Sequence, residues 1–534
     1  MDEQKNRRIT FCILAVIGLL YFCALIPFNL TGAETPEMLE VFEVDEYAQY
    51  PHLIRMLTPG DGIYATLRNF FIYLHYFYGF PFYFWSAVSV FPLKLFGAFG
   101  RPENTRVTVC VLRQMISVLP MILSAGLLTL YITRFRSILL SVCVDVLLLT
   151  MPAVLENDFW WHPDSLTLLF LCLTFFFLDR DRLRCGRNFL FAAAACGAAV
   201  GTKYLGFYFA LAIPAYLLCC LLYRTIGIRQ FFGRAALFLL VMAASILFSD
   251  PLLLLPQERA EIIGIMKQQL ELSGTGIFLR YENSFLENGH LPVWLTENYL
   301  RLPWLILSLL ALIGGLFDKD RIRKVSAVAA VCYLLVACTV NLNAAASRLH
   351  YFLPIMLPLA ARIPSLHDRF PERMKRSAAL CLGLLMAVQI GINLGMDRSL
   401  LQTQLTREDN SGSIALYKTL EEAYLPLPEV PAERMTRIYR DWKAYFPEQD
   451  GYAVMTDWDL ATLGLIEEWH PDLILLEKEN IRAYASEDIL DQAVDREKMK
   501  ETAAFYRAAA ADEIPGYKLL FENGFGAVFR KELP

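Results

Sequence analysis

The sequence predicts a polytopic α-helical membrane protein of about 11–13 spans, with a small α/β domain outside the membrane. Of its 534 residues, 56% are apolar and only 19% are charged, whereas a soluble protein carries about 25% charged residues. The apolar residues form repeated runs, each long enough to cross a hydrocarbon core as a helix of roughly 20 residues. After about residue 396 these runs stop and Pro, Glu and Arg become common. We therefore predict a transmembrane catalytic domain at 1–396 and an outer domain at 397–534.

The basic clusters predict the orientation, because short cytoplasmic loops carry the excess of Lys and Arg. The first apolar run, Ile9 to Phe28, follows Lys5, Arg7 and Arg8 and lacks a small-residue cleavage site, which indicates a retained signal-anchor. The basic clusters lie at 5–8, 180–187, 224–234, 319–324 and 362–376. With these clusters inside, the N-terminus is cytoplasmic and the C-terminal domain lies outside, in a bacterial inner (plasma) membrane.

The predicted spans are the apolar runs between these loops. They cover 9–28, 107–131, 136–154, 165–178, 188–203, 206–223, 235–255, 302–317, 325–340, 351–363 and 377–396. Segment 80–99 is apolar and aromatic and is also long enough to span, but adding it alone reverses the sidedness of all that follows. Either it is a re-entrant or interfacial element, or one of the long runs contains a second crossing.

The outer domain shows strand and helix patterns of its own. Residues 452–457 and 471–477 are predicted strands on either side of a predicted helix at 460–468. Residues 517–521 and 525–529 flank Asn523-Gly524, which is a strong hairpin signal. These patterns predict a small α/β domain.

Charge and cysteine content exclude several classes of function. The net charge of −5 gives no basic patch for nucleic acid. All 12 cysteines lie at or before Cys381, which excludes a disulfide-stapled outer domain, and no CxxC pair indicates zinc. No cofactor is predicted; a divalent metal remains open but is not indicated.

An acidic pair in the first outer loop (30–79) is the leading candidate for chemistry. Asp45 and Glu46 are followed by Arg55 at helical spacing. A carboxylate can take a proton from an attacking hydroxyl or amine. Because adjacent residues do not share a helix face, we expect one of the two to face the reaction and the other to orient or bind; Asp45 is the predicted base.

Further ionisable groups gather in the same outer segments, where charged side chains near a membrane are functional candidates. They are His75, Arg113, His162, Asp164, Lys203, His290, Arg348 and His350. Arg and Lys could hold a leaving phosphate. The alternative is that each one merely anchors a helix end. The aromatic stretch 73–85, with Tyr83 and Trp85, offers surfaces for sugar rings or isoprenoid chains, or forms an interfacial belt. The segment Gly197 to Lys203 is similar to a phosphate-binding loop, but its order is Thr-Lys rather than Lys-Thr and it lies in a predicted span, so it is discounted.

Taken in order, these motifs resemble those of the GT-C superfamily of polyprenyl-phosphate-sugar-dependent glycosyltransferases. The similar branch holds the protein O-mannosyltransferases and the lipid A aminoarabinose transferase. The motifs are Asp45-Glu46 with 54–57, Gly79–Trp85 with 95–97, Leu112-Arg113, His162–Asp164, Gly201–Lys203 with 210–214, Gly289–Trp294 and Arg348–Pro354. Two features depart from the pattern: Phe80 stands where the aminoarabinose transferase has a Lys, and no large lectin-like domain is inserted.

The resemblance implies an inverting transfer of a sugar from a polyprenyl-phosphate donor on the extracytoplasmic face, often without metal. It assigns the catalytic role to Asp45, Glu46 and Asp164, donor phosphate binding to Arg113, Lys203 and Arg348, and substrate binding to Arg55, His162, His290, His350, Tyr83 and Trp85. The acceptor, whether lipid, glycan or protein, is left open. The alternative functions are a transporter or flippase of lipid-linked glycans, and a membrane scaffold whose outer domain binds a partner.

Overall fold

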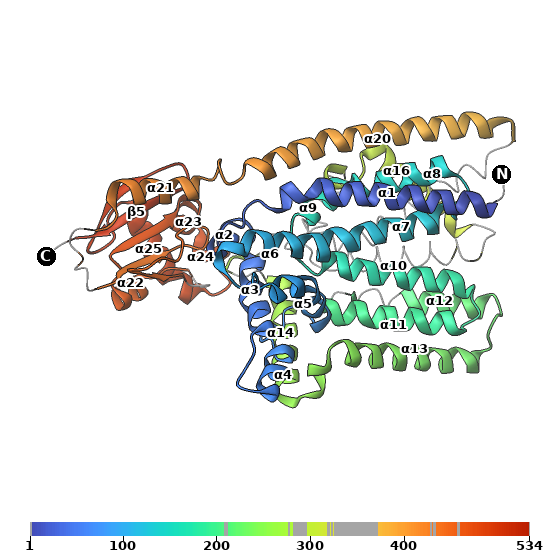
Figure 1. Ribbon diagram of the computed structural model, residues 1–534, viewed down its shortest axis with the longest axis horizontal. Coiled ribbons are helices and arrows are strands. Elements are labelled where there is room, and N and C mark those ends of the chain that lie inside the picture. Colours follow the sequence, from blue (N-terminus) through green and yellow to red (C-terminus); the bar gives the residue numbers. More distant parts are fainter. Residues whose placement is uncertain are drawn as a thin grey trace.

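A bundle of long helices carries a sheet domain at one end in the computed structural model (Figure 1). The structure describes residues 3–532 apart from 205, 208–211, 276–277, 281–295, 318–320, 322–323, 325–371, 428–429, 431–433 and 457–459. The N-terminus, the α10–α11 connection and the α12–α13 connection all lie at the end of the bundle farthest from the sheet domain (Figure 1). Three of the basic loops predicted to share one side of the membrane, at 5–8, 180–187 and 224–234, therefore share one end of the bundle.

The bundle helices coincide with the predicted apolar runs. They are α1 (Glu3–Asn29), α6 (Thr105–Leu112) continuing through the π-helical turn η2 (Arg113–Val118) into α7 (Leu119–Thr133), α8 (Ile138–Leu149), α9 (Pro152–Asp158), α10 (Asp164–Asp181), α11 (Arg187–Thr202), α12 (Ala212–Leu222), α13 (Ile228–Ser249), α16 (Leu302–Leu316) and α20 (Glu372–Thr406). Within the described ranges, 4 helices are long and apolar enough to cross a membrane, or 5 if α8 and α9, bent by 61°, form one span. The helical membrane fold is confirmed; two predicted spans, 325–340 and 351–363, lie outside the described residues.

Small residues let α11 pack closely against α13. A Cβ atom added at Gly197 would lie 2.5 Å from the Met242 carbonyl oxygen, and one at Gly201 would lie 2.2 Å from Ser249 Oγ. Close helix approach in membranes commonly uses glycines four residues apart. These glycines therefore serve helix packing, which agrees with discounting a phosphate loop there.

Short helices gather where the bundle meets the sheet domain. They are α2 (Pro36–Phe42), α3 (Val44–Leu57), α4 (Ile63–Phe71), α5 (Phe80–Leu95) and α14 (Pro256–Thr275) (Figure 1). Helix α5 is the ambiguous segment at 80–99, and it packs against α3, α6 and α11 at this end. That position favours the interfacial interpretation. Helix α4 buries no residue and exposes Ile63 and Tyr64 by more than 80%, as suits a helix lying at a membrane surface.

The C-terminal domain is a five-stranded sheet with the strand order β2-β1-β3-β5-β4. Strands β1 (Thr436–Arg440), β2 (Tyr452–Met455) and β3 (Leu473–Glu477) are parallel, and the hairpin of β4 (Tyr517–Glu522) and β5 (Gly526–Lys531) adds antiparallel strands. The helices are α21 (Gly412–Tyr424), α22 (Leu463–Trp469), α23 (Lys478–Ala485), α24 (Ile489–Gln492) and α25 (Arg496–Ala510). The predicted hairpin, the strands at 452 and 471 and the helix between them are present.

Two features of this domain differ from the prediction. Strand β1, at the centre of the parallel part, was not predicted. Helix α20 runs unbroken to Thr406, so the predicted domain boundary at 396/397 falls inside a helix. The polar residues after Met396 signalled the end of an apolar run, but a helix needs no apolar face once it leaves the bundle.

Candidate functional site

Helix α3 separates the two members of the acidic pair. Glu46 is fully buried. Its Oε1 accepts hydrogen bonds from Arg113 Nε at 2.8 Å and from the Trp161 amide at 2.6 Å, and its Oε2 lies 2.5 Å from Arg113 Nη2. Asp45 is partly exposed, and its charge contributes to the raised pKa of Tyr83 in α5. Glu46 is thus committed to the protein interior, whereas Asp45 is not fully buried.

Arg113, which the sequence predicts as a contact of the donor phosphate, is bonded to the protein itself in this structure. The Arg113 side chain is fully buried, and besides its two bonds to Glu46 its Nη1 donates to the carbonyls of Asn29 at 3.0 Å and Thr31 at 2.8 Å. A guanidinium has five N–H donors, so these four bonds commit nearly all of them to the protein. Arg113 fixes Glu46 and the turn after α1, and no face of it is open to a ligand.

Tyr83, whose pKa is affected by the charge of Asp45, contacts a histidine pair. The Tyr83 hydroxyl lies 2.6 Å from His75 Nδ1, and the His75 and His52 rings are 5.0 Å apart. Burial, together with the neighbouring His52, lowers the pKa of His75 to about 3, so this ring is neutral at physiological pH. Burial and then the charge of Asp45 raise the pKa of Tyr83, which keeps its hydroxyl protonated as a hydrogen-bond donor.

A second polar group forms where α10 begins. Asp164 is buried, and its Oδ1 accepts from Lys203 Nζ at 2.6 Å and faces His162 Nδ1 at 3.1 Å. His162 Nε2 in turn lies 2.9 Å from the Tyr78 hydroxyl, and its ring stacks on Trp160 with centroids 3.5 Å apart. Lys203 follows the last turn of α11 and keeps 11% of its side chain exposed, so its ammonium is held in place and still reaches solvent.

The two groups form one cluster through the loop before α10. The Trp161 amide donates to Glu46, and Gln49 of α3 donates to the Trp161 carbonyl at 3.3 Å. The His75 and Tyr78 rings lie 5.9 Å apart. We call the following set the acid–histidine cluster: Asp45, Tyr83, His75, Tyr78, His162, Asp164 and Lys203.

A close backbone approach holds the loop that carries His75 and Tyr78. The Gly79 amide donates to the Thr202 carbonyl at 3.1 Å. A Cβ atom at Gly79 would overlap the Gly201 carbonyl oxygen at 1.6 Å. Only glycine permits this contact, which seats the aromatic loop on the end of α11 beside Lys203.

The other predicted site residues have different environments. Arg55 is partly buried on the same side of α3 as His52, and its Nε has no hydrogen-bond partner among the described residues. Trp85 is 46% exposed on the outside of α5, as an interfacial aromatic would be. His290, Arg348 and His350 lie outside the described residues. Sequence reasoning placed His75 among the candidate ionisable groups without giving it a role, and it did not single out Tyr78, although the aromatic stretch that contains both was noticed.

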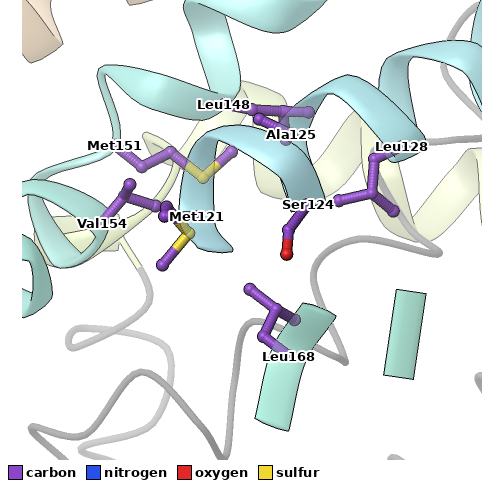
Figure 2. Close-up of a pocket in the computed structure, with 8 residues that line it drawn as sticks. All are labelled: Met121, Ser124, Ala125, Leu128, Leu148, Met151, Val154 and Leu168. Atoms are coloured by element: carbon purple, nitrogen blue, oxygen red, sulfur yellow. The ribbon is translucent and has the colours of Figure 1, made fainter. Parts of the chain in front are cut away.

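Two cavities lie near the site. One of about 460 Å³ opens between α3, α4 and α5; its lining is Met56, Leu57, Pro59, Thr66, Leu67, Phe70, Ala87, Val88, Phe91 and Lys94. Lys94 Nζ donates to the Leu57 carbonyl. The other, between α7, α8, α9 and α10, has only about 10 Å³ and is lined by Met121, Met151 and Leu168 among others (Figure 2); it is too small and apolar for a ligand.

In the described part of the chain, no three His, Cys, Asp or Glu side chains gather to hold a metal ion.

Comparisons with known proteins find a shared fold and no sequence match. No family model matches the chain, and no curated protein matches its sequence. Its structure is similar to the crystal structure of ArnT from Cupriavidus metallidurans bound to undecaprenyl phosphate, with a TM-score of 0.57, 11% identity and 97% of each chain covered. The apo structure of the same enzyme gives a TM-score of 0.53 at 12% identity, again over 97% of each chain. The chain therefore shares the fold of the ArnT structures along nearly its whole length.

Proposed function

We propose, from this shared fold, that the protein is a membrane glycosyltransferase that takes a sugar from a polyprenyl-phosphate donor. One observation carries the proposal: α3, α5, α10 and α11 bring a partly exposed carboxylate, Asp45, into one cluster with a held cation, Lys203. A base and a phosphate-binding cation are the two groups that such a transfer needs. The solved ArnT structure contains undecaprenyl phosphate, which supports a donor of this class.

The proposed mechanism begins with Asp45 as the general base. It takes the proton of an acceptor hydroxyl or amine as that atom attacks the anomeric carbon of the donor sugar. The bond between this carbon and the phosphate oxygen breaks, its electron pair stays on the phosphate, and the configuration at the carbon inverts. Lys203, held by Asp164, stabilises the charge that the leaving phosphate gains. In this mechanism Arg348 also binds the phosphate, as the sequence predicts. Arg55, His290 and His350 bind the substrate, again as the sequence predicts.

The donor's isoprenoid chain has a candidate path beside the site. The cavity between α3, α4 and α5 is lined almost wholly by apolar side chains, and α4 exposes Ile63 and Tyr64 next to it. An isoprenoid chain gains free energy by leaving water for such a surface. Lys94 is the charged member of the lining. We propose that this cavity takes the part of the chain nearest the phosphate.

The decisive experiment uses the purified full chain in lipid with a panel of polyprenyl-phosphate sugars and a membrane extract as acceptor. We expect release of free polyprenyl phosphate and an acceptor increased by the mass of one sugar, both absent with Asp45→Asn. The transporter alternative predicts that intact donor crosses a vesicle membrane with no bond cleavage. Crossing without cleavage for every donor would overturn the proposal.

A further inference from the structure

Three glutamates before and within α3 each face an arginine from a different part of the chain. Glu40, Glu43 and Glu46 are spaced three residues apart across the α2–α3 junction. Their partners are Arg440 at the end of β1, Arg407 just after α20 and Arg113 in the bundle. We call these three pairs the glutamate–arginine ladder. Asp45 lies between its second and third pairs.

The ladder is buried to a degree that charged residues rarely reach. The side chains of Glu46 and Arg113 are 0% exposed, and those of Glu40 and Arg440 are 1% and 2% exposed. The second pair is less buried: Arg407 is 9% and Glu43 26% exposed, and they lie 3.8 Å apart. Because desolvation offsets the attraction within a buried ion pair, such pairs add little net stability, and their attested use is to fix one geometry.

The second and third pairs are joined through the turn after α1. The Thr31 carbonyl accepts from both Arg113 and Arg407. Gly32 has φ +69°, and a Cβ atom there would lie 2.5 Å from the Arg407 guanidinium. A movement of Arg407 would therefore reach Arg113, and through it Glu46.

The arginine of the first pair belongs to the sheet domain, whereas Glu40 lies in α2. Arg440 Nη1 donates to the carbonyls of Trp442 at 2.9 Å and Ala444 at 3.3 Å, which aims the guanidinium at Glu40. Met38 of α2 packs in the same apolar core as Leu416 and Ile438 of the domain. Helix α2 is thus attached to the C-terminal domain by both charge and apolar packing.

We propose that the C-terminal domain positions the catalytic carboxylate, with Arg440 and Arg407 acting as positioning residues that hold the α2–α3 junction so that Asp45 faces Tyr83. The inference rests on the proposed function for its kinetic test. A displacement of about 1 Å at a reacting group can lower a rate roughly 10²-fold. The domain would then control turnover without touching the donor.

Arg440→Met is the test variant. We expect kcat to fall at least about 10-fold while the KM for the donor changes less than about threefold, since Lys203 and the cavity are untouched. Arg440→Lys should recover part of kcat, because it restores a charge at Glu40. The double variant Glu40→Gln/Arg440→Met should regain thermal stability, having no unpaired buried charge, yet keep the low kcat. Full recovery of kcat in the double variant would overturn the inference.

Arg434→Met is the matched control. Arg434 pairs with Asp472 at 2.7 Å in the same sheet domain, at the opposite ends of β1 and β3. Its loss should lower stability and leave kcat unchanged; an equal fall in kcat would show that any damage to the domain has the same effect, which overturns a positioning role for Arg440.

Hydrogen exchange gives a readout that needs no activity. Arg440→Met should speed exchange in 44–57, whereas Arg434→Met should not. If wild-type protein transfers no sugar but shows this difference, the proposed function fails and the ladder stands. If exchange in 44–57 is unchanged by Arg440→Met, the ladder does not hold α3.

Discussion

At the scale of single residues, substitutions of the two adjacent carboxylates are expected to have different effects. Asp45→Asn keeps the side-chain volume and removes the base, so the rate should fall ~10²–10⁴-fold with thermal stability unchanged. Glu46→Gln instead leaves the buried Arg113 guanidinium without its counter-charge, which costs about 3–5 kcal/mol of stability. Product formation and thermal unfolding, measured on both variants, separate the two roles. Asp45→Asn retaining more than roughly a tenth of the wild-type rate would defeat the base assignment.

Lys203 makes a separate prediction about the donor. Lys203→Gln removes the cation that Asp164 holds, so donor binding should weaken more than acceptor binding. Arg113→Gln should lower stability without a selective effect on donor affinity, because its donors bind the protein. Titration of both variants with a polyprenyl-phosphate sugar checks this. An unchanged donor affinity in Lys203→Gln would place the phosphate elsewhere.

At the scale of elements, strand β1 shows what the sequence alone could not supply. A buried parallel strand normally appears as a continuous apolar run, but Thr436–Arg440 carries Arg437 and Arg440. Arg440 is tolerated there because Glu40, 400 residues away in sequence, lies against it. The sequence is also insufficient for Arg113. Its residue type suggests a phosphate ligand, and only the folded structure shows that its guanidinium pairs with Glu46. The bundle helices and the hairpin were predictable because their signals are local, whereas the pairing of Asp164 with Lys203 appears only in the folded structure.

The edge where β1 and β3 end predicts a pH dependence for the sheet domain. Burial and the charge of Glu477 raise the pKa of Asp441 to about 7, although Asp441 accepts from the Tyr506 hydroxyl at 2.8 Å. The folded domain therefore holds a proton that the unfolded chain has released, so stability falls as pH rises from about 4 to 7. Asp441→Asn should flatten this dependence in thermal unfolding, and Asp491→Asn, at an exposed carboxylate of the same domain, should not. An equal slope in Asp441→Asn and wild type would assign the dependence to another group.

At the scale of the whole molecule, the α10–α11 and α12–α13 connections lie at the opposite end of the bundle from α3 and α5, the helices that carry Asp45 and Tyr83 (Figure 1). If the basic end is cytoplasmic, the cluster and the sheet domain face outward. Asp409→Cys, in the exposed turn after α20, should react with a membrane-impermeant thiol reagent on intact cells. Arg229→Cys, near the start of α13, should react only after permeabilisation. Both are made in a background with the exposed Cys12, Cys23 and Cys381 replaced by Ser. The reverse pattern would place the cluster in the cytoplasm.

Helix α20 connects the membrane bundle mechanically to the region around Asp45. Its 35 residues run without a break from the basic end of the bundle to the sheet domain (Figure 1), a length of about 52 Å at ~1.5 Å per residue. A change of one degree in its tilt would shift its outer end by about 1 Å over that length. Membrane helices adjust their tilt to the local thickness of the bilayer. Arg407 follows the last turn of α20 and contacts the Thr31 turn and Glu43. A change in bilayer thickness that tilts α20 would therefore shift the residues that hold Asp45 in place.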